Sequence, residues 1–253
     1  MSKKLSLVMI TKDCELLLDD ALKSAKNIVD EIIVVDDYSK DKTVDIAKKY
    51  GAKIYKNRHE YFGGQKAYGL KRAFGEWVLI LDSDERLTSQ VKEEINRIIN
   101  LKSTFDGYNI GFNNHFLGRS VSRGGENYKK LILFKRNRAY IKLVMVHEEV
   151  IVPSRKIGKL KNKINHYSYR SLYQVYRKFT IYALKEARQK YDRNEKASLK
   201  KILLYPFHMF WARFIKDKGY KDGIFRIPLD LGFAYMELLT YISLFILTLK
   251  KRS

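Results

Sequence analysis

The chain has 253 residues, of which 45 % are hydrophobic and 13 % aromatic, so it can form one large domain with or without an appendage and is not a disordered sequence. Its single cysteine, Cys14, excludes an internal disulfide and a cysteine-rich zinc site and favours a reducing, cytoplasmic environment. The net charge of +22 predicts contact with a polyanion, either nucleic acid or an anionic membrane.

The first 85 residues alternate between short apolar runs and helical patterns. The runs predict strands at residues 5–10, 31–35, 52–55 and 77–81, and the spacing predicts helices at about 15–25, 42–50, 65–74 and 89–100. Uniformly apolar strands between helices indicate an α/β fold with a mostly parallel central sheet covered on both faces. The first run is shorter than a signal-peptide core, so no export signal is expected.

The pattern changes in the second half of the chain. Residues 106–152 hold short alternating segments with glycines between them, which predicts an antiparallel extension of the sheet. From Ser171 helical spacing returns, with lysine and arginine between the apolar residues. Residues 155–226 carry 20 basic and 5 acidic side chains, a net of +15, against +6 for residues 1–154. We therefore expect one domain over residues 1–170 and a basic, amphipathic helical extension over 171–253.

The most apolar segment of this extension is Leu229–Leu249, which Asp230 and Glu237 interrupt. Its uncharged part, Leu238–Leu249, makes roughly 18 Å of helix, short of the ~30 Å hydrocarbon core of a bilayer. A spanning helix, an interfacial or partner-contacting helix and a core helix all stay open. The aromatic and basic stretch Tyr205–Phe214 suits a headgroup boundary, so we expect attachment to an anionic membrane surface.

Carboxylates follow two of the predicted strands. Asp36 ends one run, and Asp82 and Asp84 follow another. Ligands of a parallel sheet bind beyond the carboxyl ends of its strands, and a divalent cation relieves the repulsion between clustered carboxylates. Mg²⁺ and Mn²⁺ prefer such oxygen ligands and bridge to phosphates. The alternative is that one aspartate caps the next helix or that both face solvent.

Six stretches, in their order and spacing, resemble a known family. They are Leu7–Lys12, Ile32–Thr43, Phe62–Lys66, Gly75–Glu85, Val146–Glu148 and His166–Tyr169. Over residues 5–170 they are similar to the inverting family 2 glycosyltransferases with the GT-A fold, a Rossmann-like nucleotide-diphospho-sugar transferase fold, and above all to the lipopolysaccharide-core glucosyltransferase subgroup. The sequence departs from that pattern at Tyr38, where the family usually has glycine, and at Ala67, where it usually has asparagine.

The resemblance implies a metal-dependent hexosyltransferase. Its donor would be a nucleotide-diphospho-sugar, a UDP-sugar by expectation, and its acceptor a hydroxyl of a glycan or lipid-linked molecule in cell-surface polysaccharide or lipopolysaccharide synthesis. Residues 1–170 would form the catalytic domain, with Mg²⁺ or Mn²⁺ as cofactor. We expect a cytoplasmic protein, peripheral on the cytoplasmic face of the inner membrane, with no nucleic-acid partner.

The resemblance also implies roles for single residues on the donor side. Asp36 falls where the family contacts the uracil or ribose, and Thr11 where its backbone meets the nucleotide. Asp82 would lie near the ribose and the metal, and Asp84 would ligate the metal. Lys66 would approach the pyrophosphate, although a solvated helix lysine is an equal alternative.

Inversion at an anomeric carbon needs a base for the acceptor hydroxyl, because that hydroxyl loses its proton as the nucleotide leaves. Glu148 and Glu149 are the candidates, and the resemblance favours Glu148. His166 is expected to complete the metal shell, as a histidine does in proteins of this fold; its alternative is a structural role beside Tyr167 and Tyr169.

Two other functions remain open on the sequence. A basic nucleic-acid-binding protein would explain the charge and the 18 tyrosines, but no recognisable DNA or RNA module is present. A sugar-phosphate nucleotidyltransferase would share the fold class, but that class has a glycine-rich loop after the first strand, where this chain has Thr11–Glu15.

Overall fold

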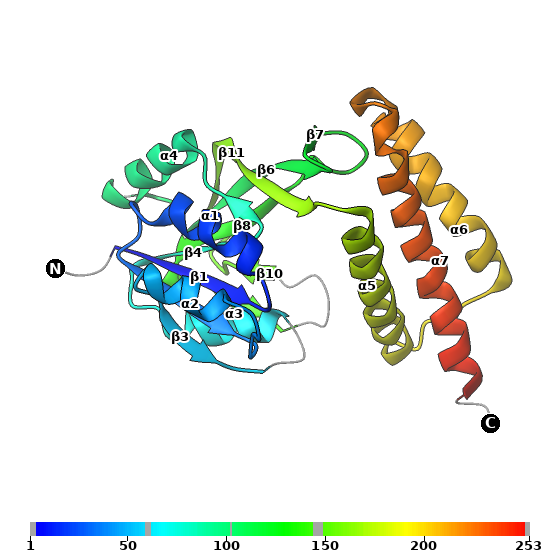
Figure 1. Ribbon diagram of the computed structural model, residues 1–253, viewed down its shortest axis with the longest axis horizontal. Helices are drawn as coiled ribbons and strands as arrows, with labels where there is room; N and C mark the ends of the chain where they lie inside the picture. Colours follow the sequence, from blue (N-terminus) through cyan, green and yellow to red (C-terminus); the bar gives the residue numbers. More distant parts are fainter. Residues whose placement is uncertain (1–3, 59–61, 102, 144–148, 251–253) are drawn as a thin grey trace. The chain divides into compact units, whose positions relative to one another are not determined.

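A computed structural model of the chain describes residues 4–58, 62–101, 103–143 and 149–250 (Figure 1). The chain forms two compact units. Unit 1 comprises Met1–Phe112 and Tyr128–His166, and unit 2 comprises Asn113–Asn127 and Tyr167–Ser253. The domain boundary expected at residue 170 stays a prediction.

The amino-terminal half of unit 1 alternates strands and helices, as predicted. Its elements are β1 (Leu5–Thr11), α1 (Glu15–Ala25), β2 (Glu31–Asp36), α2 (Thr43–Lys49), β3 (Lys53–Lys56), α3 (Phe62–Leu70), β4 (Trp77–Ile80), β5 (Glu85–Arg86) and α4 (Ser89–Asn100). α3 ends before the predicted residue 74, because the amides of Arg72 and Ala73 bond to carbonyls only three residues earlier and tighten the chain into a turn.

The central sheet has two parts. Strands β3, β2, β1 and β4 are parallel neighbours in that order. The sheet continues in the order β8, β6, β11 and β5, with antiparallel pairing of β4 with β8, β8 with β6 and β11 with β5. These added strands are β6 (Gly107–Phe116), β8 (Lys129–Lys135) and β11 (Ile157–Tyr169), and β7 (Arg119–Val121) pairs with β6. Strands β9 (Tyr140–Lys142) and β10 (Glu149–Ile151) form a separate two-stranded antiparallel sheet. The mixed α/β fold with an antiparallel extension is confirmed.

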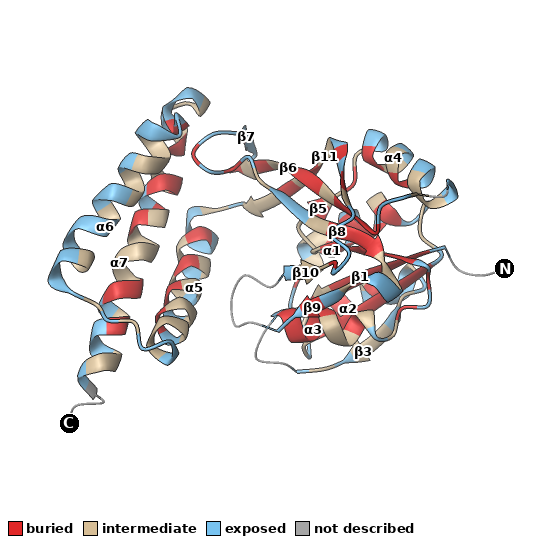
Figure 2. Cartoon of the chain, turned by 180° about the vertical axis from the view of Figure 1, so that it is seen from behind, coloured by how far each residue is buried: buried red, intermediate tan, exposed pale blue. Residues whose placement is uncertain are grey.

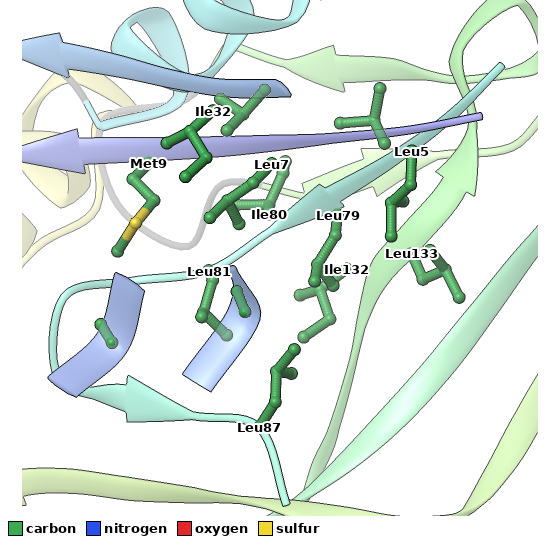
Figure 3. Packing of buried hydrophobic residues seen from close by; sticks show 14 of the residues in the cluster. Leu5, Leu7, Met9, Ile32, Leu79, Ile80, Leu81, Leu87, Ile132 and Leu133 are labelled. Carbon is green, nitrogen blue, oxygen red and sulfur yellow. The ribbon is translucent and has the colours of Figure 1, made fainter. Parts of the chain in front are cut away.

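The parallel strands are apolar on both faces because both faces are covered. Leu5, Leu7 and Met9 of β1 point to one side, toward the cluster that includes Leu79 and Leu81 (Figure 3). Val8 points to the other side, where α3 lies against it. α3 can approach this closely because residue 69 is glycine: a Cβ there would lie 2.6 Å from Cγ1 of Val8.

Strand β11 is a feature that the sequence reading missed. Its inward residues alternate with lysines, so that Gly158, Leu160, Ile164 and His166 are buried. This period of two is a strand signal, although the lysines make the segment look simply basic. β11 places His166 in unit 1, opposite Glu85 of β5.

Unit 2 contains three long helices: α5 (Leu172–Asp192), α6 (Leu199–Trp211) and α7 (Ile227–Lys250). The side chain of Ser171 caps α5 by accepting a hydrogen bond from the amide of Gln174. α7 contacts both α5 and α6. By length and composition Ile224–Leu249 is the one described helical stretch that could cross a membrane, and 28 % of its most apolar window is buried.

A cluster of buried charges ties the short turns of unit 2 together. Arg226 is fully buried and bonds to Asp222, Asp230 and the carbonyl of Gly124. Arg213 bonds to Asp230 as well. The sequence suggested that the charges of the basic segment form a positive surface exposed to solvent. Two of these charges do not, because Arg213 and Arg226 neutralise buried carboxylates.

Candidate functional site

Three strand ends converge at one edge of the parallel sheet. Because β1 lies between β2 and β4, the residues at and just after their carboxyl ends are neighbours: Thr11, Asp36 and Asp82. Thr11 and Asp36 are register partners in the β1–β2 pairing. The residues expected at the ligand edge therefore lie together there, which is where α/β sheets bind ligands.

Asp36 is fully buried and its carboxylate is fixed by hydrogen bonds. The hydroxyl of Thr11 donates to Oδ1 at 2.9 Å, and the amide of Ser39 donates to Oδ2 at 2.9 Å. The hydroxyl of Ser39 donates to Oδ1 as well. Ser39 was not predicted, although a serine three residues after an aspartate is a recognisable turn signal. The turn keeps the Asp36 side chain in one orientation.

Tyr38 lies in that turn with a left-handed backbone, at φ +53°. Glycine adopts this conformation without strain, which accounts for the usual glycine at this point of the family pattern. The exposed ring of Tyr38 lies 5.2 Å from the guanidinium carbon of Arg58, a cation–π contact. Arg58 and Lys12 both pair with the carboxylate of Asp37. The rim of the edge is therefore basic and aromatic.

Lys66 reaches Asp82 from α3. Its Nζ lies 3.2 Å from Oδ1 of Asp82, and the residue is only 8 % exposed. Lys66 is therefore a buried, paired lysine and not a solvated one. Burial raises the pKa of Asp82, but the ammonium groups of Lys66 and Lys130 lower that pKa further than burial raises it. Asp82 is accordingly a carboxylate at neutral pH.

The turn after β4 is fixed by its own residues. Glu85 is buried, and its Oε2 accepts a hydrogen bond from the amide of Asp82 at 2.9 Å. Arg86 donates to the carbonyls of Ser83 and Leu17, at 2.7 and 2.6 Å. Burial, with the charges of Asp82 and Asp84, raises the pKa of Glu85 to about 7. Neither Glu85 nor Arg86 was predicted, because their roles depend on contacts made after the chain turns.

Asp84 and His166 meet across the pairing of β5 with β11, in which His166 lies opposite Glu85. Nε2 of His166 lies 3.5 Å from Oδ2 of Asp84. The other ring nitrogen, Nδ1, lies 3.3 Å from the hydroxyl of Tyr128. The ring edge also contacts Phe112, with centroids 5.7 Å apart. Two of the three predicted metal ligands therefore face each other.

The fit to a divalent ion was tested on this donor set. Among the described residues, no group of three or more His, Cys, Asp or Glu side chains is arranged to hold a metal ion by itself. Oδ1 of Asp82, however, is buried and accepts no hydrogen bond from any described residue; Lys66 approaches it only as an ion pair. Carboxylate oxygens with one imidazole suit Mn²⁺, and ions of this kind often take one or two carboxylates plus substrate phosphates. The chemical types of these side chains therefore fit a divalent ion such as Mg²⁺ or Mn²⁺.

The predicted base, Glu148, lies outside the described residues, as does His147. Glu149, the alternative base, begins β10 and is exposed. The preference for Glu148 over Glu149 as the base therefore stays a prediction.

The chain is similar to known glycosyltransferases. The family model described as glycosyl transferase family 2 matches residues 6–148. An uncharacterized glycosyltransferase of Rickettsia typhi is 29 % identical over 262 residues, covering 99 % of this chain and 90 % of that protein. The lipopolysaccharide core biosynthesis glycosyltransferase LpsC of Rhizobium meliloti is 21 % identical, covering 87 % and 84 %.

Solved structures give a looser likeness. Residues 1–349 of S. aureus TarS in complex with UDP-GlcNAc are 16 % identical, cover 98 % of this chain and 92 % of that one, and superpose with a TM-score of 0.49. A likeness at this level identifies no ligand for the present chain. The family match over residues 6–148 includes the strands and turns that build the edge with Thr11, Asp36 and Asp82.

Proposed function

Since the chain belongs to glycosyl transferase family 2, we propose that this glycosyltransferase moves a sugar, with inversion, from a nucleotide-diphospho-sugar to a hydroxyl of a glycan or lipid-linked acceptor. The family match leaves the nucleic-acid and nucleotidyltransferase alternatives without support. UDP is the nucleotide that the motif around Asp36 favours.

One observation carries the proposal: a buried carboxylate and a buried ammonium lie at the same sheet edge. Asp36, fixed by Thr11 and Ser39, suits the hydrogen-bond donors of a uracil or ribose. Lys66 suits the negative charge of a diphosphate leaving group, because a buried ammonium in a site with little water stabilises anionic oxygens strongly. Asp82 orients that ammonium.

Asp84 and His166 would hold a divalent ion, Mg²⁺ or Mn²⁺, beside Asp82. When bound, the ion would neutralise charge on the diphosphate oxygens of the leaving group. Oδ1 of Asp82, which pairs with Lys66 but accepts no hydrogen bond from a described residue, supports this assignment. The hydroxyl of Tyr128 against the second ring nitrogen of His166 supports it as well.

Glu148 would take the proton from the acceptor hydroxyl. Its support is the Val-His-Glu stretch of the family resemblance. Inverting transfer needs no covalent enzyme intermediate, so the remaining task of the protein is to hold the two substrates and exclude water.

The acceptor proposal is narrower: a cell-surface polysaccharide or lipopolysaccharide precursor met at the cytoplasmic face of the inner membrane. The name of the Rhizobium meliloti relative supports the lipopolysaccharide pathway. The exposed apolar residues of α6 support a peripheral membrane location.

Thermal unfolding with UDP tests the proposal. UDP with Mn²⁺ or Mg²⁺ is expected to raise the midpoint of unfolding, UDP alone to raise it less, and Asp84→Ala to remove the metal-dependent part. If oligonucleotides stabilise the protein and UDP with metal does not, the proposal is wrong. Screening nucleotide-sugars in the same assay then identifies the donor sugar.

The base is tested separately. Glu148→Gln is expected to keep donor binding and to lose transfer, because the amide is similar in shape but accepts no proton. Undiminished transfer by Glu148→Gln with loss in Glu149→Gln would move the role to Glu149.

A further inference from the structure

Helix α6 differs from the other long helices of unit 2. α5 buries four residues, among them Phe179 and Ala183, and α7 buries Leu244 and its neighbours. α6, all of whose residues the structure describes, buries none (Figure 2). The sequence of α6 is nevertheless strongly apolar, with Leu, Phe and Trp through its length. An apolar helix without a buried residue requires an explanation.

The large apolar residues of α6 that are at least half exposed fall on one face. We name as the α6 stripe the large apolar side chains of this face and of the turn that follows it: Leu203, Leu204, Phe207, Trp211 and Ile215. Phe207 is 76 % exposed and Trp211 50 % exposed. Residues four apart lie one above the other on a helix, so the stripe is continuous. The opposite face of α6 is used inside unit 2, where Tyr205 contacts Tyr241 at a ring distance of 5.1 Å.

Positive charge surrounds the α6 stripe. Residues 199–221 carry six basic and one acidic side chain, and of the basic ones Arg213 belongs to the buried ion-pair cluster. Lys200 lies at the start of the helix, and Lys216 and Lys218 follow it; all three are exposed. Phenyl and indole rings flanked by lysines suit the boundary between anionic lipid headgroups and acyl chains. A second copy of the chain is a poorer occupant, because it would bring the same positive charge to the same surface.

Helix α7 is the competing membrane element, and its contacts argue against a span. It contacts α5 and α6 along its length. Its Asp230 is fully buried and paired with Arg226 and Arg213. Moving this helix into hydrocarbon would separate Asp230 from Arg213 and would carry the charges of Asp230 and Arg226 toward the lipid, which is expensive.

We propose that the α6 stripe and its flanking lysines form the surface by which the enzyme lies on an anionic membrane, with Phe207 and Trp211 at headgroup depth. The inference deepens the proposed function and rests on it, since a lipid-linked acceptor would be met at this surface. It assigns the contact to α6 and leaves α7 within unit 2.

Tryptophan fluorescence tests the contact directly. The chain has two tryptophans, of which Trp77 is 2 % exposed and Trp211 is half-exposed. Vesicles of phosphatidylglycerol and phosphatidylcholine are expected to shift the Trp211 emission to shorter wavelengths. The protein is also expected to sediment with these vesicles, and both effects are expected to weaken in high salt. Vesicles of phosphatidylcholine alone are expected to bind it at least tenfold more weakly. No shift, or binding that ignores the phosphatidylglycerol content, overturns the proposal.

Matched variants connect the binding to the α6 stripe. Phe207→Glu is expected to lower vesicle binding at least tenfold. Leu101→Glu changes an apolar residue of unit 1 that is 64 % exposed, and it is expected to leave binding unchanged. A double variant, Lys200→Gln with Lys218→Gln, is expected to weaken binding without altering the apolar residues. Equal loss in Leu101→Glu and Phe207→Glu overturns the assignment to α6. A blue shift that appears without lipid as the protein concentration rises also overturns it, since a second copy then covers the stripe.

UDP stabilisation, measured on the same samples, separates this inference from the proposed function. Phe207→Glu is expected to keep the full stabilisation by UDP and Mn²⁺. Stabilisation without vesicle binding would overturn the membrane surface alone. Vesicle binding by a protein that UDP and metal do not stabilise would overturn the proposed function, and with it the acceptor argument.

Discussion

Nε of Arg226 donates a hydrogen bond to Oδ2 of Asp230 at 2.8 Å, and both residues are fully buried. The same guanidinium donates to the carbonyl of Gly124, so the arginine joins three segments of unit 2. Arg213 pairs with Glu126 and Asp230 in the same cluster. A buried charge of this kind is tolerated because each donor has an acceptor, and removing one partner leaves the other uncompensated.

The first prediction concerns Gly124. A Cβ at this position would lie 2.2 Å from Nη2 of Arg226, and the residue has φ +57°. Gly124→Ala is therefore expected to displace Arg226 and to lower the free energy of unfolding by about 3–5 kcal/mol, the range for a broken buried ion pair. Chemical denaturation followed by Trp211 emission measures it.

Gly118→Ala is the control for that variant. Gly118 also has positive φ, at +79°, but no described atom lies within 4 Å of its added Cβ. Its cost is expected to be backbone strain alone, of roughly 1 kcal/mol. Equal costs for the two variants would show that Arg226 is not held as described.

The second prediction concerns the proposed nucleotide contact. Asp36→Asn removes a charged acceptor and is expected to weaken UDP binding roughly 10- to 100-fold, as for a lost charge-assisted hydrogen bond of about 1.5–3 kcal/mol. Isothermal titration calorimetry measures it. Asp37→Asn is the matched control: Asp37 pairs with Lys12 and Arg58 at the rim, so a change below about threefold is expected there. A similar loss in both variants would argue for general electrostatics.

The third prediction concerns the orientation of His166. Tyr128→Phe removes the hydroxyl 3.3 Å from Nδ1 of the imidazole. This hydroxyl would orient His166 as a metal ligand. Its loss is expected to raise about tenfold the Mn²⁺ concentration at which UDP gives half of its maximal stabilisation of the protein. UDP binding without metal is expected to stay unchanged. Tyr108→Phe, which loses a hydroxyl contact to Ser103 instead, is expected to change neither quantity.

The fourth prediction concerns the pH dependence of stability. The hydroxyl of Ser154 lowers the pKa of Asp106 more than burial raises it, and Lys135 lowers it further. A carboxyl whose pKa is lower in the folded state contributes stability above its ordinary pKa and loses it as pH falls through the lowered value. Asp106→Asn is therefore expected to be less stable than the parent chain at pH 7, by roughly 1–3 kcal/mol.

That difference is expected to shrink below about pH 4, the ordinary pKa of aspartate, and to vanish once Asp106 is protonated in both states. Thermal unfolding from pH 2.5 to 7 measures it. A difference that stays constant over this range would show that the side chain contributes by shape and not by charge.

The parallel half of the fold was predictable because its signals are local. The runs that form β1, β2 and β4 are apolar without alternation, as strands buried on both faces must be. Once their order in the sheet follows from the α/β pattern, Thr11, Asp36 and Asp82 must end at one edge. The contact between Thr11 and Asp36 is a direct consequence of that register.

The rest was not predictable because it depends on contacts distant in sequence. β5 has two residues and exists only because β11 pairs with it. The buried charges of Arg226 and Asp230 read in the sequence as ordinary solvated residues, since hydropathy says nothing of partners. For the apolar end of the chain, hydropathy likewise does not show that Asp230 pairs with Arg213, 17 residues earlier.

The pairing of β5 with β11 also bears on the order in which a nascent chain acquires its site. Thr11, Asp36 and Lys66 come from consecutive elements, so they can come together while the ribosome is still making the antiparallel strands. Asp84 meets His166 only when the last strand of the sheet has been made and a long loop has closed, which is the slow kind of contact. A partly synthesised chain would therefore bring Thr11, Asp36 and Lys66 together before Asp84 meets His166.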